Sequence, residues 1–270
     1  MKSKFLLINK PVDWTSHDVV AYVRSYTRKK TGIKKTHPIK SSGNPEVGKA
    51  KFNRVKVGHA GTLDPFATGL LIVGVGREST KRLDEFKNLP KTYEAVLKLG
   101  ETSDTCDSTG EILKQVQNDN DTNVILSLLR DPLKTKKISP LRSASVEMTK
   151  PTKKQIKQTL KSFTGKQLQT PPMFSAKKVK GKKLYDLARQ GITIERKPCE
   201  IIIYKIKLKK YKYPYLKIKV ECSTGTYIRT LADDIGKKLE VGAYCDELKR
   251  TRIGKYKLWR AKKVPFKKFK

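Results

Sequence analysis

A single carboxylate, Asp64, lies in a short glycine-rich stretch, GHAGTLDPFATGLL at residues 58–71. Gly58 and Gly61 allow positive backbone φ angles and close approach of a ligand, and Pro65 fixes the turn after the aspartate. A carboxylate held in this way can act as a nucleophile or as an electrostatic partner, since aspartate, with a pKa of about 3.9, is ionised at neutral pH. The alternative from the local sequence is structural, because an Asp-Pro pair commonly caps a turn or a helix.

The cysteine and histidine residues do not predict a metal site or a cofactor. No C-x-x-C pair occurs, and the residues that could bind a metal are far apart: Cys106, Cys199, Cys222, Cys245, His17, His37 and His59. The apolar run at the N-terminus is shorter than the core of a signal peptide, and no apolar stretch is long enough to cross a membrane. We therefore expect a cytoplasmic protein with reduced thiols, no metal and no membrane contact.

The charge of the chain predicts a polyanionic partner. Lysine and arginine number 61 against 25 acidic residues, which gives a formal net charge of +36. Such an excess repels itself on a folded domain unless an anion screens it, and nucleic acid is the leading candidate. A solvated basic surface is the alternative, and binding to a membrane surface is less favoured because no long basic amphipathic helix is evident.

Periodicity predicts the elements that position Asp64. We expect a strand ending at Pro11, a helix capped by Thr15 or Ser16, and a strand buried on both faces at LLIVGVG after Gly69. Alternation in KTYEAVLKLG places Tyr93 on the buried side of a half-buried strand. Further expected elements are a helix with a capping box at Thr152 and Gln155, a short helix in GKKLYDLARQG, two strands joined near Pro214, and a helix from about Tyr227.

Three basic segments are expected to be loops or tails. Residues 31–54 lack the apolar content to pack, so they are predicted to be a basic insertion loop. Residues 166–183 combine two prolines, an exposed Met173 and Phe174, and several lysines, which suits insertion into folded RNA. The tail at residues 255–270 is basic and is predicted to be frayed.

A series of motifs in fixed order resembles the TruB family of tRNA pseudouridine synthases. They run from about Lys4 to Gly254: NKPVDWTSHDVV, GHAGTLDPFATGLL, GREST, KTYEAVLKLG, TSDTCDSTG, PPMFSAKKVKGKKLYDLARQG, CSTGTYIRTLADDIG and LKRTRIG. The resemblance implies an isomerase that converts one uridine in the T arm of tRNA, at position 55, to pseudouridine. The uracil is detached, rotated and rejoined through C5 without net redox change, so no cofactor or metal is implied.

The resemblance also implies roles for particular residues. Asp64 matches the catalytic aspartate, Arg229 is expected to pair with it, and Tyr93 resembles the tyrosine that stacks on the target base. His59 matches the residue that fills the space left by the flipped uridine. The remaining matches are to substrate-binding residues: Tyr227, Leu248, Lys10 and Lys81. Structural alternatives are a surface arginine at a helix start for Arg229, a core tyrosine for Tyr93, a backbone hydrogen bond for His59, and support of the site for Lys10.

The expected fold is α+β, with a central, largely antiparallel mixed sheet flanked by helices and loops. Residues 1–254 are expected to form the catalytic domain, without the separate C-terminal RNA-binding domain that family members commonly carry, and the protein is expected to act as a monomer on the T-arm stem-loop of tRNA. A protein that only binds or folds RNA is the alternative function, and the joint presence of Asp64, Tyr93 and Arg229 argues against it. A guide-RNA-dependent relative is disfavoured.

Overall fold

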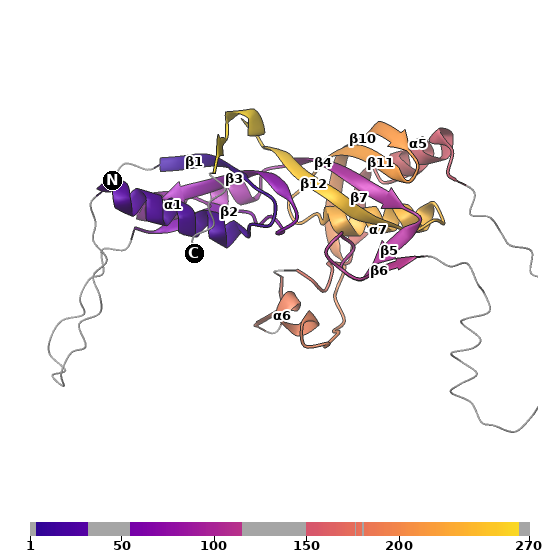
Figure 1. Cartoon of the computed structure of the whole chain (residues 1–270), viewed down its shortest axis with the longest axis horizontal. Coiled ribbons are helices and arrows are strands. Elements are labelled where there is room, and N and C mark those ends of the chain that lie inside the picture. Colours follow the sequence, from indigo (N-terminus) through magenta and orange to yellow (C-terminus); the bar gives the residue numbers. More distant parts are fainter. Residues whose placement is uncertain (1–3, 32–54, 115–149, 176, 180, 265–270) are drawn as a thin grey trace, which may run out of the picture.

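A mixed β-sheet forms the centre of the molecule. The computed structural model describes residues 4–31, 55–114, 150–175, 177–179 and 181–264. Within these residues the main path of the sheet runs β14 (Lys262–Lys263), β1 (Lys4–Lys10), β3 (Thr68–Val75), β12 (Ala243–Ile253), β4 (Lys91–Leu99), β11 (Tyr215–Cys222), β10 (Cys199–Lys212) and β7 (Gly165–Gln169) (Figure 1). Strands β2 (Val57–Ala60) and β13 (Tyr256–Lys257) pair with β3 and β12.

Most neighbours in this sheet are antiparallel, and the two parallel pairs are β1 with β14 and β3 with β12. The remaining strands form two small hairpins, β5 (Glu101–Ser103) with β6 (Ile112–Lys114) and β8 (Lys178–Val179) with β9 (Lys182–Lys183). The helices are α1 (Ser16–Thr31), α2 (Arg77–Lys81), α3 (Asp84–Lys87), α5 (Lys153–Ser162), α6 (Leu184–Ala188), α7 (Ile228–Lys238) and the 3-10 helix η1 (Leu258–Arg260). The expected α+β fold with a largely antiparallel mixed sheet is confirmed.

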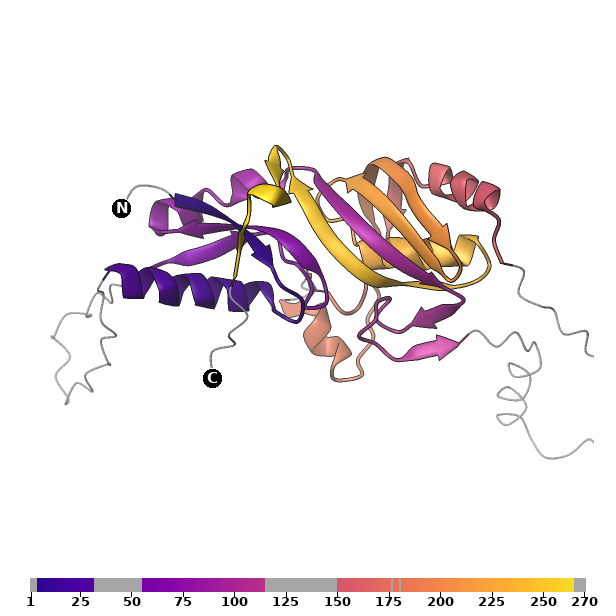
Figure 2. The ribbon, with the colours of Figure 1, turned by 45° about the horizontal axis from the view of Figure 1, so that its top comes forward.

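The N-terminal half of the sheet is covered on both faces (Figure 2). Helix α1 buries Val19, Val20 and Val23 in one cluster together with alternate residues of β3. On the other face of β3, Leu70 and Ile72 lie in a second cluster that includes Phe86 of α3. Burial on both faces explains the uninterrupted apolar sequence of β3. Leucine, isoleucine and valine side chains therefore fix the strand that follows the Asp64 loop.

The other half of the sheet has one buried and one open face. In β4 the buried residues Ala95, Leu97 and Leu99 alternate with partly exposed ones, as predicted. They pack in a cluster with β11, α5 and α7, and α5 begins with the predicted capping box between Thr152 and Gln155. The opposite side of β10 and β11 carries exposed lysines. Tyr93, on β4, and Arg229, on α7, therefore belong to this half of the molecule.

A short seam joins the two halves of the sheet. Strands β3 and β12 share only the register pairs Thr68 with Lys249 and Gly69 with Arg250. A Cβ atom on Gly69 would lie 2.3 Å from the carbonyl oxygen of Arg250, and the φ angle of Gly69 is +111°. Only glycine allows the strands to approach this closely. The Asp64 loop leads directly into this seam.

Several elements differ from the sequence-based expectations. Strand β12 was not predicted, because its sequence AYCDELKRTRI alternates poorly and contains the buried charge of Arg250. The start of the expected loop at residues 166–183 is strand β7, which ends at Gln169, and Met173 and Phe174 are half-buried and not exposed. The expected frayed tail is wrong up to Val264, because β14 pairs with β1. Residues 32–54 of the predicted basic loop and residues 265–270 of the predicted tail lie outside the described residues. No helix that the structure describes is long and apolar enough to span a membrane.

Candidate active site

The loop that carries Asp64 is held by two elements of the N-terminal half. The hydroxyl of Ser16, at the start of α1, accepts a hydrogen bond from the Leu63 N–H at 2.9 Å. The ammonium of Lys10, at the end of β1, donates to the carbonyl of Pro65 at 3.0 Å. The backbone of Asp64 closes a turn by accepting from the Ala67 N–H at 3.2 Å. The backbone therefore makes the turn that Asp-Pro predicts, which leaves the carboxylate free for other contacts.

Arg250, on β12, fixes the same loop from the opposite side. Its Nη2 and Nη1 atoms donate to the carbonyls of Gly61 and Thr62 at 3.0 and 3.3 Å, and its Nε atom donates to the carbonyl of Leu70 at 2.8 Å. The side chain is fully buried. The φ angle of Gly61 is +85°, as its role in the loop requires, whereas Gly58 does not adopt a positive φ angle. One guanidinium thus ties both ends of the Asp64 loop to β12.

The carboxylate of Asp64 pairs with Arg229, as expected. The Nε atom of Arg229 lies 2.9 Å from Oδ2 of Asp64. Its Nη1 atom lies 3.1 Å from Oδ2 of Asp107 and donates to the carbonyl of Thr105 at 3.0 Å. Its Nη2 atom donates to the carbonyl of Phe174 at 2.7 Å. Arg229 is therefore buried between two carboxylates and is not a surface arginine at the start of α7.

A cavity of about 560 Å³ contains the carboxylate and most of the expected site residues. Five of the expected residues besides Asp64 line it: Tyr93, Arg229, His59, Tyr227 and Leu248. Asp64 exposes 36% of its side chain, whereas the Arg229 side chain exposes 4%. A ligand in the cavity would therefore meet the carboxylate, with the arginine behind it. The cavity is also basic, because its lining includes Lys87, Lys91, Lys177 and Arg250.

Burial sets the protonation states in the cavity. Burial raises the pKa of the Asp64 carboxyl above its usual value, and the charge of Arg229 opposes this rise. Burial also raises the pKa of Tyr93, so that its phenol is neutral at pH 7. The pKa of His59 falls to about 4, mainly because of burial and also because His17 and Arg250 are close. The cavity thus presents an acidic group next to neutral rings.

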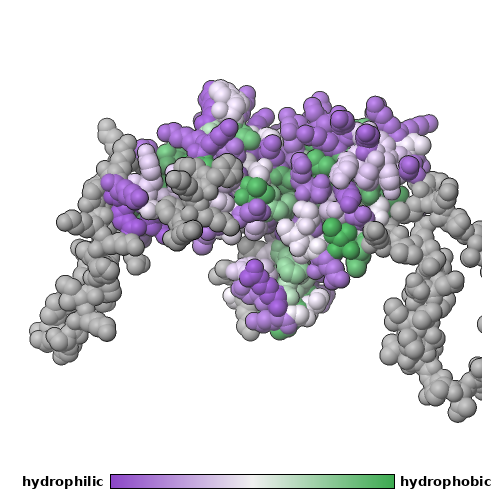
Figure 3. All heavy atoms as spheres, viewed as in Figure 1, coloured by the Kyte–Doolittle hydropathy of each residue, from purple (hydrophilic) through white to green (hydrophobic). Residues whose placement is uncertain are grey.

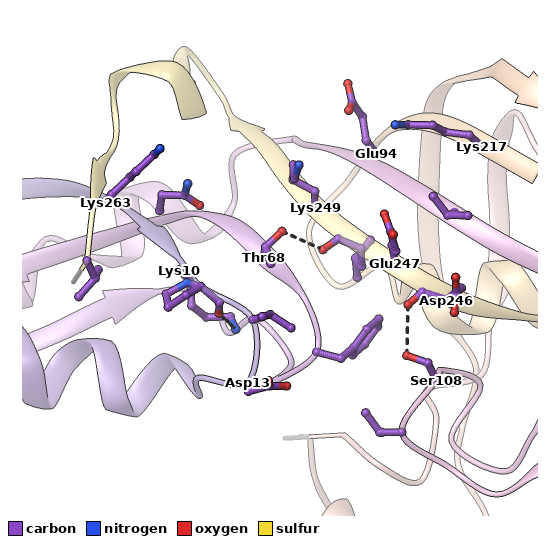
Figure 4. Close-up of a pocket in the computed structure, with 18 residues that line it drawn as sticks. Lys10, Asp13, Thr68, Glu94, Ser108, Lys217, Asp246, Glu247, Lys249 and Lys263 are labelled. Carbon is purple, nitrogen blue, oxygen red and sulfur yellow. Dashed lines mark hydrogen bonds between the residues drawn. The ribbon is translucent and has the colours of Figure 1, made fainter. Parts of the chain in front are cut away.

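Two of the expected residues do not line this cavity. Lys81 is exposed on α2, where its ammonium lies 3.6 Å from a carboxylate oxygen of Glu78. Lys10 lines a separate cavity of about 770 Å³ beside the seam between β3 and β12 (Figure 4). Its ammonium donates to the carbonyls of Pro11, Trp14 and Pro65, which matches the supporting role that the sequence left open. Burial lowers the pKa of Lys10 to about 8.

Sequence reasoning missed two buried residues of the site, Asp107 and Arg250. Asp107 lies in the turn-forming motif SDTCDSTG, where an aspartate is normally a turn residue. Its Oδ1 atom does accept the local hydrogen bonds of such a turn, from the hydroxyls of Thr105 and Thr109, and only its Oδ2 atom reaches Arg229. Arg250 lies in the motif LKRTRIG, which contains other basic residues, so the sequence does not indicate which of them is buried. In the part of the chain that the structure describes, no group of three His, Cys, Asp or Glu side chains could hold a metal.

Comparisons with known proteins identify a family and several relatives. The model of the TruB family pseudouridylate synthase N-terminal domain matches residues 49–147 and 135–228. The tRNA pseudouridine synthase B of Protochlamydia amoebophila is 41% identical over 251 residues, which cover 93% of this chain and 74% of the relative. The protein of the same name from Parabacteroides distasonis is 39% identical over 94% of this chain and 87% of the relative.

Solved structures share the fold. A chain of a Cbf5-Nop10-Gar1 complex superposes with a TM-score of 0.55 at 23% identity, over 94% of this chain and 49% of that chain. A chain of an H/ACA RNP bound to a substrate RNA containing 2'-deoxyuridine superposes with a TM-score of 0.52 at 21% identity, over 94% and 48%. This chain spans about half the length of those solved chains. From the family match and the identity to the curated relatives, this chain belongs to the TruB family of pseudouridylate synthases.

Proposed function

We propose that this protein is a tRNA pseudouridine synthase that isomerises the T-loop uridine at position 55 to pseudouridine. The observation that carries the proposal is the Asp64–Arg229 ion pair, at 2.9 Å, in a basic cavity that Tyr93 also lines. The names of the relatives from Protochlamydia and Parabacteroides support tRNA as the substrate.

The residues of the cavity suit the individual steps of this reaction. The target uridine is stacked inside the T loop, so it must flip out before Asp64 can reach it. His59, as a neutral ring at pH 7, is suited to stack in the vacated space, and Tyr93 is suited to stack on the flipped base. The ionised carboxylate of Asp64 then assists departure of the uracil, which rotates and rejoins the ribose through C5. The C1'–N1 bond breaks and the C1'–C5 bond forms, while C5 loses a proton and N1 gains one, so the atoms balance without an added group.

Arg229 and the cavity lysines have supporting roles in this proposal. Arg229 favours the ionised form of Asp64 in a partly dry site, and Lys87, Lys91 and Lys177 are placed to meet backbone phosphates of the T arm. Residues 1–254 form the catalytic domain in this proposal, and the protein acts as a monomer in the cytoplasm, where tRNA is modified. The loop from Gln169 to Lys183, whose Phe174 carbonyl accepts from Arg229, would contact the RNA next to the cavity.

The test is to incubate purified protein with unmodified tRNA, tag pseudouridine chemically and locate it by mass spectrometry. We expect one tagged position in the T loop for the wild type. Asp64→Asn should lose at least about 10⁴-fold in rate, the scale observed when a residue that takes part in the chemistry is removed. Its tRNA affinity should stay within about threefold, because many cationic contacts carry the affinity. Turnover by Asp64→Asn at a near-native rate would contradict the assignment.

A further inference from the structure

The outer side of β10 and β11 is an open face of the sheet. Ile203, Leu216, Ile218 and Val220 point to the other side and are fully buried in the core. Most of the residues that alternate with them are exposed, whereas Ile202 and Glu221 are half-buried. Figure 3 shows a mainly hydrophilic surface over the region where Figure 1 places these two strands. As far as the described segments of the chain go, this face is therefore available to a partner.

Six exposed lysines occupy this face, which we call the lysine face: Lys205, Lys207, Lys210, Lys212, Lys217 and Lys219. In the register of the two strands Lys207 lies directly opposite Lys219, and Lys210 lies directly opposite Lys217. Like charges in directly opposite positions destabilise a sheet. Among the described residues none of the six forms an ion pair. Glu221, which lies opposite Lys205, is 3.9 Å from Arg252 instead. Glu94 of β4 also lies opposite Lys219, so two carboxylates neighbour the six lysines and the face carries a net positive charge in the described structure.

Protection of a sheet edge explains only part of this arrangement. Strand β7 pairs with β10 only from Cys199 to Ile203, so the rest of β10 is an edge. Lysines on an edge strand prevent pairing with other molecules. Strand β11, however, lies between β10 and β4, so Lys217 and Lys219 protect no edge. Their pairing with other lysines points to an anionic partner.

Exposed tyrosines identify the kind of anion. Tyr204 is 50% exposed and Tyr215 is 47% exposed, and Tyr215 lies opposite Lys212. Lysine ammonium groups and tyrosine hydroxyls can both donate hydrogen bonds to the phosphate and sugar oxygens of a nucleic-acid backbone. A membrane surface fits less well, since interfacial binding requires apolar side chains that insert, and the only large exposed hydrophobic residues on these two described strands are the tyrosines.

The lysine face and the candidate active site lie on opposite sides of the sheet. Lys217 and Lys219 pair with Val96 and Glu94 of β4, whereas Tyr93, which lines the cavity, points to the other side with the core. We propose that the lysine face binds the phosphate backbone of a second RNA molecule while substrate RNA occupies the cavity. The choice of RNA over other polyanions rests on the proposed function.

The test compares two variants that each remove four positive charges. The face variant is Lys207→Gln, Lys210→Gln, Lys217→Gln and Lys219→Gln. The matched control is Lys153→Gln, Lys154→Gln, Lys157→Gln and Lys161→Gln on the exposed side of α5. The probe is a labelled, uridine-free RNA duplex, titrated across a salt series into protein saturated with T-arm hairpin. Affinity for the hairpin, pseudouridine formation and thermal unfolding are measured in parallel.

The wild type should form a ternary complex with the duplex and the hairpin. In the face variant the log–log salt slope for the duplex should be smaller by about 3, because each lost phosphate contact contributes about 0.7–0.9. Its duplex affinity in low salt should fall at least about tenfold. Hairpin affinity and turnover should match the α5 control, since all four lysines are exposed on the far side of the sheet. The unfolding temperature should be no lower than that of the control, because the variant removes two pairs of directly opposite like charges.

Three results would overturn the proposal. The face variant and the control could bind the duplex equally, or the face variant could lose hairpin affinity as strongly as duplex affinity. With vesicles of phosphatidylserine and phosphatidylcholine as a further probe, the third is that the face variant loses binding only to the vesicles. Failure of the proposed function is seen separately. In that case the wild type forms no pseudouridine, while the comparison of duplex binding by the two variants still decides the role of the lysine face.

Discussion

The Nε atom of Arg229 lies 2.9 Å from Oδ2 of Asp64, and the carboxylate side chain is 36% exposed at the cavity whereas the arginine side chain is 4% exposed. The two residues come from different halves of the sheet, Asp64 from the loop before β3 and Arg229 from the first turn of α7. On its other side Arg229 contacts Asp107. The positive charge of Arg229 therefore stabilises the ionised form of Asp64. Asp107, a second buried acid, holds the arginine side chain in position.

The pair predicts how the activity depends on pH. Burial raises the pKa of Asp64 and the charge of Arg229 opposes that rise, so the ionised, active form is lost as the pH falls through the raised pKa. Arg229→Gln removes the opposing charge, and we expect the acid limb of the single-turnover rate to move to higher pH. Arg229→Lys retains a charge, so its acid limb should lie closer to that of the wild type. An acid limb at the same pH in all three proteins would contradict this account.

Asp107 is expected to contribute to stability as well as to the position of Arg229. Both side chains of this pair are 4% exposed, so Asp107→Ala would leave a buried guanidinium without one of its carboxylates. The free energy of unfolding, measured by urea denaturation, should fall by about 3–5 kcal/mol. Asp107→Asn retains a hydrogen-bonding side chain and should cost less. Equal stability of Asp107→Ala and wild type would show that Arg229 does not need this partner.

Two substitutions of Tyr93 separate the effect of its ring from the effect of its hydroxyl. Tyr93→Phe keeps the stacking surface, so the affinity for T-arm RNA should change little, and any loss of turnover reports on the hydroxyl. Tyr93→Ala should lose affinity as well, by about 1–3 kcal/mol for a stacking platform. Binding and single-turnover rates of both variants give this comparison. Native turnover by Tyr93→Ala would assign the residue to the core.

His59 should act as a neutral ring throughout the physiological range. With its pKa lowered to about 4, the imidazole gains no proton between about pH 5 and 8, so no step in the pH–rate profile should belong to it. His59→Phe should keep most of the activity, and His59→Ala should lose more because the flat surface is gone. NMR titration of the ring protons measures the pKa directly. A pKa near 6.5 would contradict the assigned state.

The features that could be predicted from the sequence are those that depend on the pattern of neighbouring residues. Alternation in Lys91–Leu99 places Tyr93 on the buried side, and Thr152 and Gln155 form the cap that their spacing predicts. The contact of Arg229 with Asp107 joins residues that are 122 positions apart, and nothing in the neighbourhood of either residue marks it. Arg250 was missed for a related reason, because three carbonyls distant in sequence compensate its buried charge. When the partners of a buried charge are distant in sequence, the residues around that charge carry no pattern that predicts its burial.

The narrow contact between β3 and β12 makes catalysis sensitive to distortion of the sheet. The two register pairs at this seam, together with the side chain of Arg250, keep the Asp64 loop in place relative to the half that holds Arg229 and Tyr93. Local opening of so few pairs requires less free energy than global unfolding. On warming, enzymatic inactivation should therefore precede the melting of secondary structure, and the loss should reverse on cooling.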